Sequence, residues 1–458
     1  MSGGNIAEEG KTMSSEPVLY DKNKWDTSCG LDYSDPMVFW PKPYKHHDFE
    51  PLFKRTKLIS QYDMEGRGDG FQVTKKGDYL FMNHFWSSGW SVVDVKDPKN
   101  PKVVYFESTD SPHMWTLKNR VVGDILVTSN EWKFFENKRY FTNPGVRNYH
   151  DAVSSTPVKS GIKVYDVSNP AKPRLLSFYE TGVWTPEGGC SECHRFWFDG
   201  HYVYQACEVP GYEGNIMVTI DVSNPEKPRE VSKFWIKGQW IAGGERPDWP
   251  RSLPRKCQLH HPIISGNRAY TSWFGQGAAI VDISDIRIPT MVSHFNIDFG
   301  GQMHTFMPIK NGEFAILIGE YRHAWMLDIS DEVHPKVIEV FPKPPRELLE
   351  RGVGNPWGPG QHNAFEYVDS PDAWKDENTI FMTAGAGGLR IYDVNDPYRI
   401  EEIGYYVPGT PKVYYDPRGV EHASNGAGVD VVDVWVDQNG LIYLSSYNGG
   451  LEILEFEG

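Results

Sequence analysis

The chain has 458 residues and a formal net charge of −15 at pH 7, from 46 lysine and arginine residues against 61 aspartate and glutamate residues. An acidic chain without a basic cluster is poorly suited to nucleic acid, because neutralising phosphates requires grouped lysine and arginine side chains. No run of about 18 apolar residues could cross a membrane, and residues 1–17 lack the pattern of a secretion signal. We therefore expect a cytoplasmic protein that binds neither nucleic acid nor membranes.

Aromatic and turn-forming residues dominate the composition. Aromatic residues make up 14% of the chain, together with 44 glycines and 33 prolines, whereas there are only five cysteines. Rings and β-branched runs interrupted by glycine, proline, asparagine and aspartate are typical of short strands joined by tight turns. The composition predicts an all-β fold held by packing, since five cysteines are too few to cross-link a chain of this length.

One unit recurs six times: a glycine or small residue, an apolar strand, Asp-Val or Asp-Ile, and usually an Asn-Pro or Asp-Pro turn. It reads GWSVVDVKDPKNPKVVYF from Gly89 and GIKVYDVSNPAKPRLLSF from Gly161. The aspartates that mark it are Asp94, Asp166, Asp221, Asp282, Asp328 and Asp393. We expect these aspartates to cap the turns that follow them. Their uneven spacing favours four-stranded propeller blades with variable loops over a solenoid of fixed register.

A seventh set of strands begins near Asp430 and reaches the end of the chain after three strands. The segment TKLISQYDM, from Thr56, has the pattern of a fourth strand with no earlier strands before it. Pairing the two would cover two exposed sheet edges. We therefore predict a seven-bladed β-propeller over residues 56–458, closed by an N-terminal strand pairing with the last blade, and residues 1–55 as an extension over its surface.

The strand motifs SVVDV, KVYDV, AIVDI and RIYDV resemble the LVIVD repeat of β-propeller proteins. The resemblance covers roughly residues 56–458 and implies the architecture. It does not imply an activity, because one fold carries many unrelated functions.

Long loops are expected on one face of the ring, where the connections between blades gather. They span about residues 130–160, 238–258, 342–360 and 409–428 and carry several aromatic rings, among them Trp240 and Trp357. Long loops in compact domains are often functional, and aromatic walls suit a small apolar or aromatic molecule. We predict a lid over a pocket for a small-molecule substrate.

Histidine recurs at the start of the innermost strand in five blades. The residues are His113, His194, His261, His304 and His362. Asp69 and Asp433 take the corresponding places in the first and seventh blades. Only 15 of the 458 residues are histidines, so chance poorly explains five of them at the same position of successive blades. The alternative is that these rings hydrogen-bond water and neighbouring blades.

Clustered neutral imidazoles are common metal ligands, so we predict one divalent metal on the propeller axis held by His194, His261, His304 and His362. Fe(II) is favoured, with Cu, Zn or Mn as alternatives. The arrangement is similar in architecture to two groups of histidine-ligated metal propellers, with no shared sequence motif. These are the carotenoid cleavage oxygenases, which hold iron by four histidines, and the selenium-binding protein/methanethiol oxidase propellers, which place copper among histidines.

Three further residues are predicted to be catalytic. His113 would complete the ligand shell or act as a base. Glu366 and Glu320 would accept the second N–H of the ligating histidines, which orients the rings and raises their basicity. The sequence Cys190-Ser191-Glu192-Cys193-His194 matches the CxxCH pattern of covalent haem attachment, but without an export signal we expect no haem.

The leading hypothesis is a metal-dependent enzyme that oxidises a small organic compound, with an aromatic one favoured, or cleaves it with O₂. A hydrolase, lyase or isomerase could use the same site through a metal-bound hydroxide. A non-catalytic interaction scaffold is the third hypothesis, and it predicts no stoichiometric metal. The sequence gives no indication of the oligomeric state.

Overall fold

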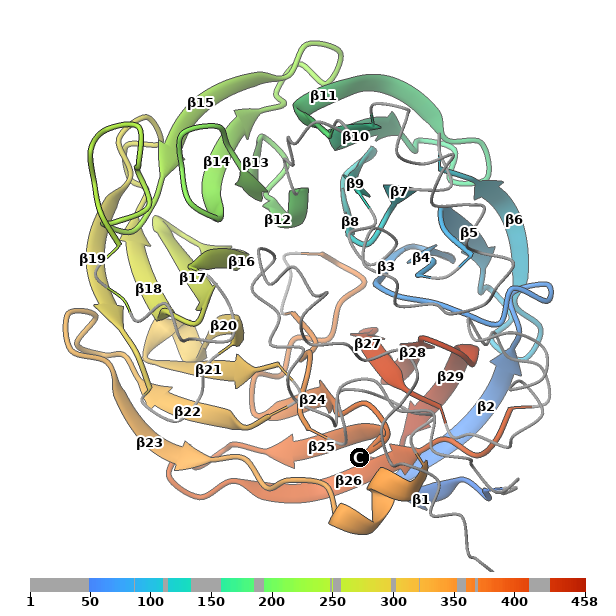
Figure 1. The fold of residues 1–458 in the computed structure, drawn as a ribbon. Helices are drawn as coiled ribbons and strands as arrows, with labels where there is room; N and C mark the ends of the chain where they lie inside the picture. The colour runs from blue at the N-terminus through green and yellow to red at the C-terminus, as the bar shows by residue number, and fades with distance from the viewer. Residues whose placement is uncertain are drawn as a thin grey trace, which may run out of the picture.

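Seven antiparallel sheets surround a central axis in the computed structural model of the chain (Figure 1). The structure describes residues 49–85, 87–109, 114–132, 158–184, 193–247, 249, 257–297, 302–320, 322–351, 360–366, 370–411 and 429–458. Two short 3-10 helices, Lys310–Gly312 and Arg346–Arg351, are the only helical elements in these ranges. No helix in the same ranges is long and apolar enough to span a membrane. The predicted all-β, seven-bladed β-propeller is confirmed.

Within most blades the strands follow one another from the axis outward (Figure 1). The first blade consists of β3 (Val73–Lys76), β4 (Tyr79–Asn83), β5 (Trp90–Asp94) and β6 (Lys102–Glu107). The second consists of β7 (Met114–Trp115), β8 (Asn119–Val122), β9 (Ile125–Trp132), β10 (Val158–Asp166) and β11 (Arg174–Trp184). The third consists of β12 (Cys193–Phe198), β13 (Tyr202–Glu208), β14 (Asn215–Asp221) and β15 (Arg229–Phe234).

The fourth and fifth blades repeat this order. The fourth consists of β16 (Gln258–Ser265), β17 (Arg268–Phe274), β18 (Gly277–Asp282) and β19 (Thr290–Phe295). The fifth consists of β20 (Met303–Ile309), β21 (Phe314–Gly319), β22 (Ala324–Asp328) and β23 (Lys336–Val340). The strand that carries the repeat motif is buried up to its final aspartate in β5, β14, β18, β22 and β25, because neighbouring sheets pack against it from either side. This explains why the repeat motif is a nearly continuous apolar run.

The N-terminal segment contributes to the last two blades. The sixth contains β24 (Thr379–Thr383), β25 (Leu389–Asp393) and β26 (Glu401–Val407), with β1 (Leu52–Lys54) paired outside β26. The seventh contains β27 (Val431–Val436), β28 (Leu441–Ser446) and β29 (Gly450–Phe456), and β2 (Thr56–Tyr62) pairs with β29 as its outermost strand. One sheet thus joins both ends of the propeller. Of the predicted extension, residues 1–48 lie outside the described residues.

The six repeat aspartates cap turns, as predicted. Each accepts a hydrogen bond from the backbone N–H two residues later. The donors are Lys96, Ser168, Ser223, Ser284, Ser330 and Asn395, at 2.8–3.0 Å. The aspartates therefore stabilise the turn that follows the repeat strand.

The repeat glycine is required by close packing between strands. Gly277 begins β18 with φ +87°, and an added Cβ would overlap the carbonyl oxygen of Phe295 on β19. Gly89 and Gly388 directly precede β5 and β25 with φ +80° and +74° and meet outer-strand carbonyls in the same way. A side chain at these positions would strain the left-handed backbone and would also collide with the outer strand.

We predict that Gly277→Ala lowers the free energy of unfolding by about 3 kcal/mol, because backbone strain and steric overlap both act. Gly266→Ala, in the same blade, is the control: Gly266 has φ +55° but no atom within 4 Å of the added Cβ. It should cost about 1 kcal/mol. Urea unfolding measures both variants, and equal losses would contradict the role of strand packing.

Candidate metal centre

A β-bulge lies near the start of β16, at the axial mouth of the ring. Leu259 pairs with Trp273 and His261 pairs with Ser272, so His260 is an extra residue on the inner strand. A bulge breaks the two-residue alternation of a strand and re-aims a side chain. The two adjacent histidines consequently have different environments.

The inner strands of other blades carry a bulge at the same place. In β20 the extra residue is His304, between the pairs Met303–Gly319 and Thr305–Ile318. In β27 it is Val432, between the paired residues Val431 and Asp433. The pairing of β12 with β13 also shifts by one residue, between Cys193 and Phe196, and His194 lies in this interval.

Four imidazoles from consecutive blades form a row, which we call the histidine row: His194, His260, His304 and His362. Successive ring centroids are 4.7 Å, 3.9 Å and 4.4 Å apart. The structure thus brings together three of the four predicted ligands. His260 occupies the place that the sequence analysis assigned to His261.

Three rings of the row are held through Nδ1. His260 Nδ1 lies 2.7 Å from the carbonyl oxygen of His304, and His362 Nδ1 lies 3.1 Å from that of Val432. His194 Nδ1 lies 3.0 Å from a carboxylate oxygen of Glu131. Because these oxygens only accept, each neutral ring carries its hydrogen on Nδ1 and keeps its lone pair on Nε2. Metal-ligating histidines commonly have this arrangement.

Two rings of the row meet a carboxylate. His304, His362 and Glu320, which directly follows β21, each offer a ligand atom, and these atoms lie within 4.8 Å of one another. This is the only group of three or more His, Cys, Asp or Glu donors this close among the described residues. Glu320, predicted as a partner of the ligating histidines, is therefore placed as a candidate ligand itself.

His260 and His304 are neutral near pH 7. Burial lowers the pKa of His260 and of His304 well below the ordinary value, and the neighbouring imidazoles and Arg195 lower it further. A neutral ring is the form that binds a metal. His260 and His304 therefore require no deprotonation before they can act as donors.

Glu131 is a site residue that the sequence analysis missed. It lies at the mouth end of β9, is 2% exposed, and accepts the Nδ1 hydrogen of His194. Glu320 stands at the corresponding end of β21. A carboxylate at the mouth end of a second strand is the sequence signal that could have identified Glu131.

Glu366 lies away from the row, in a second set of side chains that we call the charge cluster: Lys118, Arg120, Arg195, His261, Glu366 and Asp433. Its carboxylate is 3.2 Å from Lys118 Nζ and 3.5 Å from Arg120 Nη1. His261 Nε2 lies 3.3 Å from the same carboxylate without hydrogen-bond geometry. The structure therefore places His261 and Glu366 together in the charge cluster and not in the histidine row.

The two acidic residues at the histidine phase have separate environments. Asp433 accepts the backbone N–H of Val73 at 3.0 Å, and burial raises its pKa to about 7. Asp69 accepts hydrogen bonds from the backbone and hydroxyl of Ser87 and lies 3.4 Å from His84 Nδ1. Asp69 thus stabilises a turn of the first blade. His113 lies outside the described residues.

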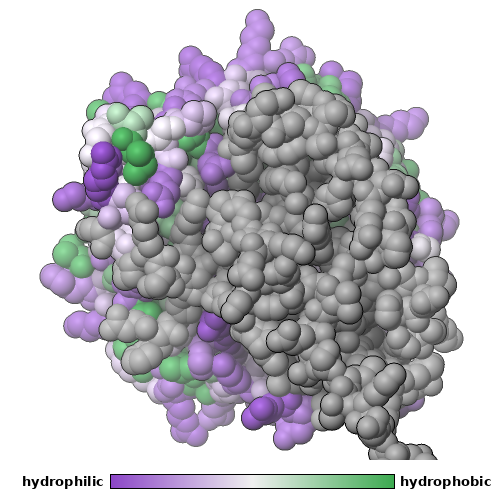
Figure 2. All heavy atoms as spheres, in the orientation of Figure 1, coloured by the Kyte–Doolittle hydropathy of each residue, from purple (hydrophilic) through white to green (hydrophobic). Residues whose placement is uncertain are grey.

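Where coloured residues are visible around the rim in Figure 2, apolar residues are scattered among hydrophilic ones. Much of the predicted lid, including Trp357, lies outside the described residues. Within the lid, Trp240 packs against Trp235 with ring centroids 5.5 Å apart.

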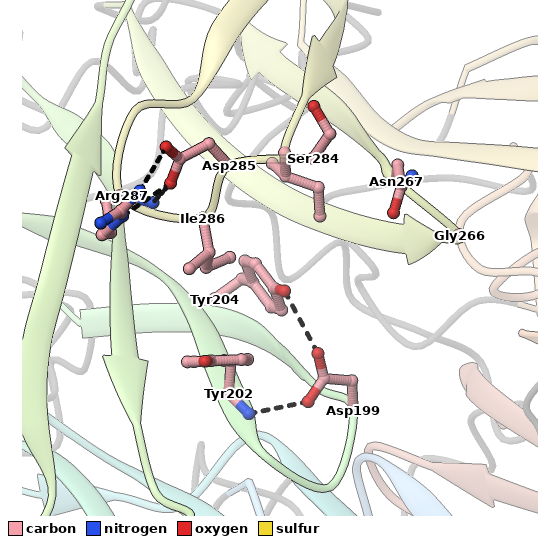
Figure 3. Close-up of a pocket in the computed structure, with 10 residues that line it drawn as sticks. Asp199, Tyr202, Tyr204, Gly266, Asn267, Ser284, Asp285, Ile286 and Arg287 are labelled. Atoms are coloured by element: carbon pink, nitrogen blue, oxygen red, sulfur yellow. Dashed lines mark hydrogen bonds and ion pairs between the residues drawn. The ribbon is translucent and has the colours of Figure 1, made fainter.

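A separate cavity of about 530 Å³ lies between the third and fourth blades (Figure 3). The charged side chains that line it contact residues of their own turns. Asp199 accepts the N–H of Tyr202 at 2.7 Å, and Asp285 pairs with Arg287 at 2.8 Å. Asp199 follows the end of β12 that is opposite His194. This cavity is therefore remote from the histidine row and carries no candidate chemistry.

Comparison with known proteins supports the architecture. The LVIVD repeat model matches residues 158–181, 195–235 and 263–297, which lie in the second, third and fourth blades. The chain therefore carries LVIVD repeats. A search of curated proteins finds no match.

Two solved structures are similar to the chain. The WD40 β-propeller domain of Doa1 has a TM-score of 0.50 at 8% identity, covering 89% of this chain and 97% of that one. A protein from Lactobacillus plantarum has a TM-score of 0.47 at 12% identity, covering 86% of this chain and 92% of that one. At 8% identity, the likeness to the Doa1 domain shows the fold alone.

The environment of His261 predicts a pH-dependent stability. Burial lowers its pKa well below the ordinary value, and Lys118, Arg195 and Arg120 lower it further. As pH falls below about 6.5, the unfolded chain binds a proton that folded His261 does not. The free energy of unfolding of metal-free protein should therefore fall about 1.4 kcal/mol per pH unit more steeply than in His261→Gln.

Urea unfolding between pH 7 and pH 5 measures this difference. His201→Gln is the control, because His201 is exposed on the turn between β12 and β13. This variant should keep the wild-type slope. Parallel slopes for wild type and His261→Gln would contradict a buried neutral ring.

Proposed function

We propose that this propeller is a metal-dependent enzyme that oxidises a small organic compound, or cleaves it with O₂, at the histidine row. The observation that carries the proposal is the grouping of His304, His362 and Glu320 within 4.8 Å, in a row whose rings are held through Nδ1. An aromatic substrate is favoured, because the predicted lid is rich in rings.

The donor set fits one divalent ion, and Fe(II) is favoured. Two imidazoles and one carboxylate form the ligand pattern of non-haem Fe(II) oxygenases, which leaves coordination positions open. Bound iron would supply a site at which O₂ and substrate meet. The residues assigned to hold it are His304, His362 and Glu320.

The other two rings of the row are assigned to substrate contact and proton exchange. His260 lies next to His304 and is neutral near pH 7, so its Nε2 can accept a hydrogen bond from substrate. His194, whose side chain is 16% exposed, is the most accessible ring, and Glu131 fixes its tautomer. The pair His194–Glu131 would then exchange protons with water.

The same donors also support a second enzyme class. Two histidines and one glutamate hold zinc in several hydrolases, where the metal activates water. A hydrolase, lyase or isomerase is therefore the alternative at this site, and metal identity separates it from the oxidative function.

We predict that untagged protein, purified without chelator, contains about one ion of iron per chain. His304→Ala and His362→Ala should each reduce metal content at least tenfold, since each removes one ligand. His334→Gln is the matched control and should retain the ion. Elemental analysis measures all four proteins. Zinc in place of iron would favour hydrolysis, and protein that stays metal-free after incubation with Fe(II) would leave the interaction scaffold as the better account.

Oxygen uptake tests the chemistry separately. Iron-loaded protein should consume O₂ when a substrate from a panel of small phenolic compounds is added, whereas zinc-loaded protein should not, because zinc has no redox chemistry. An oxygen electrode measures the rate. Equal product formation by the zinc-loaded protein, without O₂ uptake, would overturn the oxidative function and support the hydrolytic one.

A further inference from the structure

The charge cluster contains more buried cations than carboxylates. Lys118 is 1% exposed, Arg120 7% and Arg195 2%, and all three lie within 4.0 Å of the single carboxylate of Glu366. The only other acidic group of the cluster is Asp433. Buried charges are costly unless they are paired, so this arrangement leaves electrostatic free energy that a further partner can recover.

The charge count is one positive unit in excess when both carboxylates are ionised. Asp199 also acts on Arg120, but Asp199 is exposed, where water screens its charge. His261 is neutral and adds no charge. The cluster therefore carries an excess of one positive unit, or of two when Asp433 is protonated, and a bound anion would offset it.

Two donor nitrogens of Arg195 are not used in hydrogen bonds within the described part of the chain. Its Nε and Nη1 are buried and have no hydrogen-bond partner among the described residues, beyond the Glu366 oxygen at 4.0 Å from Nη1. Both ring nitrogens of His261 are in the same condition. Arg120, in contrast, donates Nε to the carbonyl of Phe198 at 2.8 Å and lies over the ring of Trp197.

Unsatisfied buried donors call for a ligand that accepts hydrogen bonds. Arg195 Nη1, Lys118 Nζ and His261 Nε2 all approach the same oxygen, Glu366 Oε1. One small group placed beside that oxygen could therefore contact all three. A carboxylate matches the charge, and its hydrogen bonds to guanidinium and ammonium groups are charge-assisted.

We propose that the charge cluster is a binding site for the carboxylate of a small organic acid. Arg195 and Lys118 are the primary contacts, and His261 contributes a hydrogen bond. Arg195 directly follows His194, and His261 directly follows His260, so the bound acid would have its remaining atoms beside the histidine row. The claim that this acid is the substrate rests on the proposed function. The claim that the cluster binds an anion does not, because binding does not require the metal.

Calorimetric titration of metal-free, full-length protein with benzoate tests the inference, with benzamide as the uncharged control. Benzoate should bind at least tenfold more tightly than benzamide. Equal binding of the two compounds, or binding of neither, would overturn the proposal on the wild-type protein alone.

Variants then locate the site. Arg195→Gln should weaken benzoate binding at least tenfold, and Arg195→Lys, which keeps the charge with fewer donors, should weaken it less. Arg246→Gln is the matched control: Arg246 is an exposed lid arginine whose Nη1 donates to the carbonyl of Glu245. Loss of binding in Arg246→Gln but not in Arg195→Gln would overturn the assignment.

Circular dichroism and unfolding midpoints verify that each variant is folded. If Arg195→Gln does not fold, the comparison of Arg195→Lys with Arg246→Gln still decides the assignment. Because no metal is present, loss of benzoate binding would leave the proposed metal centre standing, and a missing metal would leave the anion site standing.

Discussion

The bulge at the axial end of the inner strands determines which side chains reach the mouth of the ring. An inner strand without it would continue a strict alternation, and neighbouring residues would point to opposite faces. With it, His260 and His304 occupy equivalent places although they lie on different blades. The residues that follow, His261 and Thr305, occupy a second equivalent place.

Two polar layers result from this register. Imidazoles from four consecutive blades form the histidine row. Residues within or directly after the register shifts of β12, β16 and β27 contribute Arg195, His261 and Asp433 to the charge cluster. The layers differ in chemistry: the buried rings of the row are neutral donors, whereas the cluster concentrates cations around Glu366. Arg195 contributes to both, since its charge helps to lower the pKa of His260 and His304.

The scaffold is stable enough to tolerate a polar axis. Stability comes from the apolar faces between blades and from pairing β2 with β29, which joins the two ends of the ring in one sheet. The axis can therefore hold buried polar groups whose arrangement is costly, as functional sites commonly do.

Much of this architecture is encoded locally and could be predicted. The repeat aspartates cap their turns through bonds to residues two positions away, and the strand from Thr56 follows from counting the strands of the last blade. The choice between His260 and His261 could not be predicted, because a bulge is a property of pairing between two strands. A period of two gives no reason to prefer either member of an adjacent pair.

The missed side chains have a similar explanation. Glu131 acts on a histidine 63 residues away, across a blade boundary. Lys118 and Arg195 had a visible signal, since each is a cation next to an apolar residue of an inner segment, WTLKN and HRFWF. Their convergence on Glu366 depends on closure of the ring, which brings distant blades to one axis.

A crystal structure of the metal-loaded protein, with anomalous diffraction at the edge of the bound metal, tests the central claim most directly. The account predicts one anomalous peak about 2.1 Å from Nε2 of His304, Nε2 of His362 and a carboxylate oxygen of Glu320. A peak elsewhere, or Nε2 atoms of these rings bonded to protein groups with no ion between them, would contradict it.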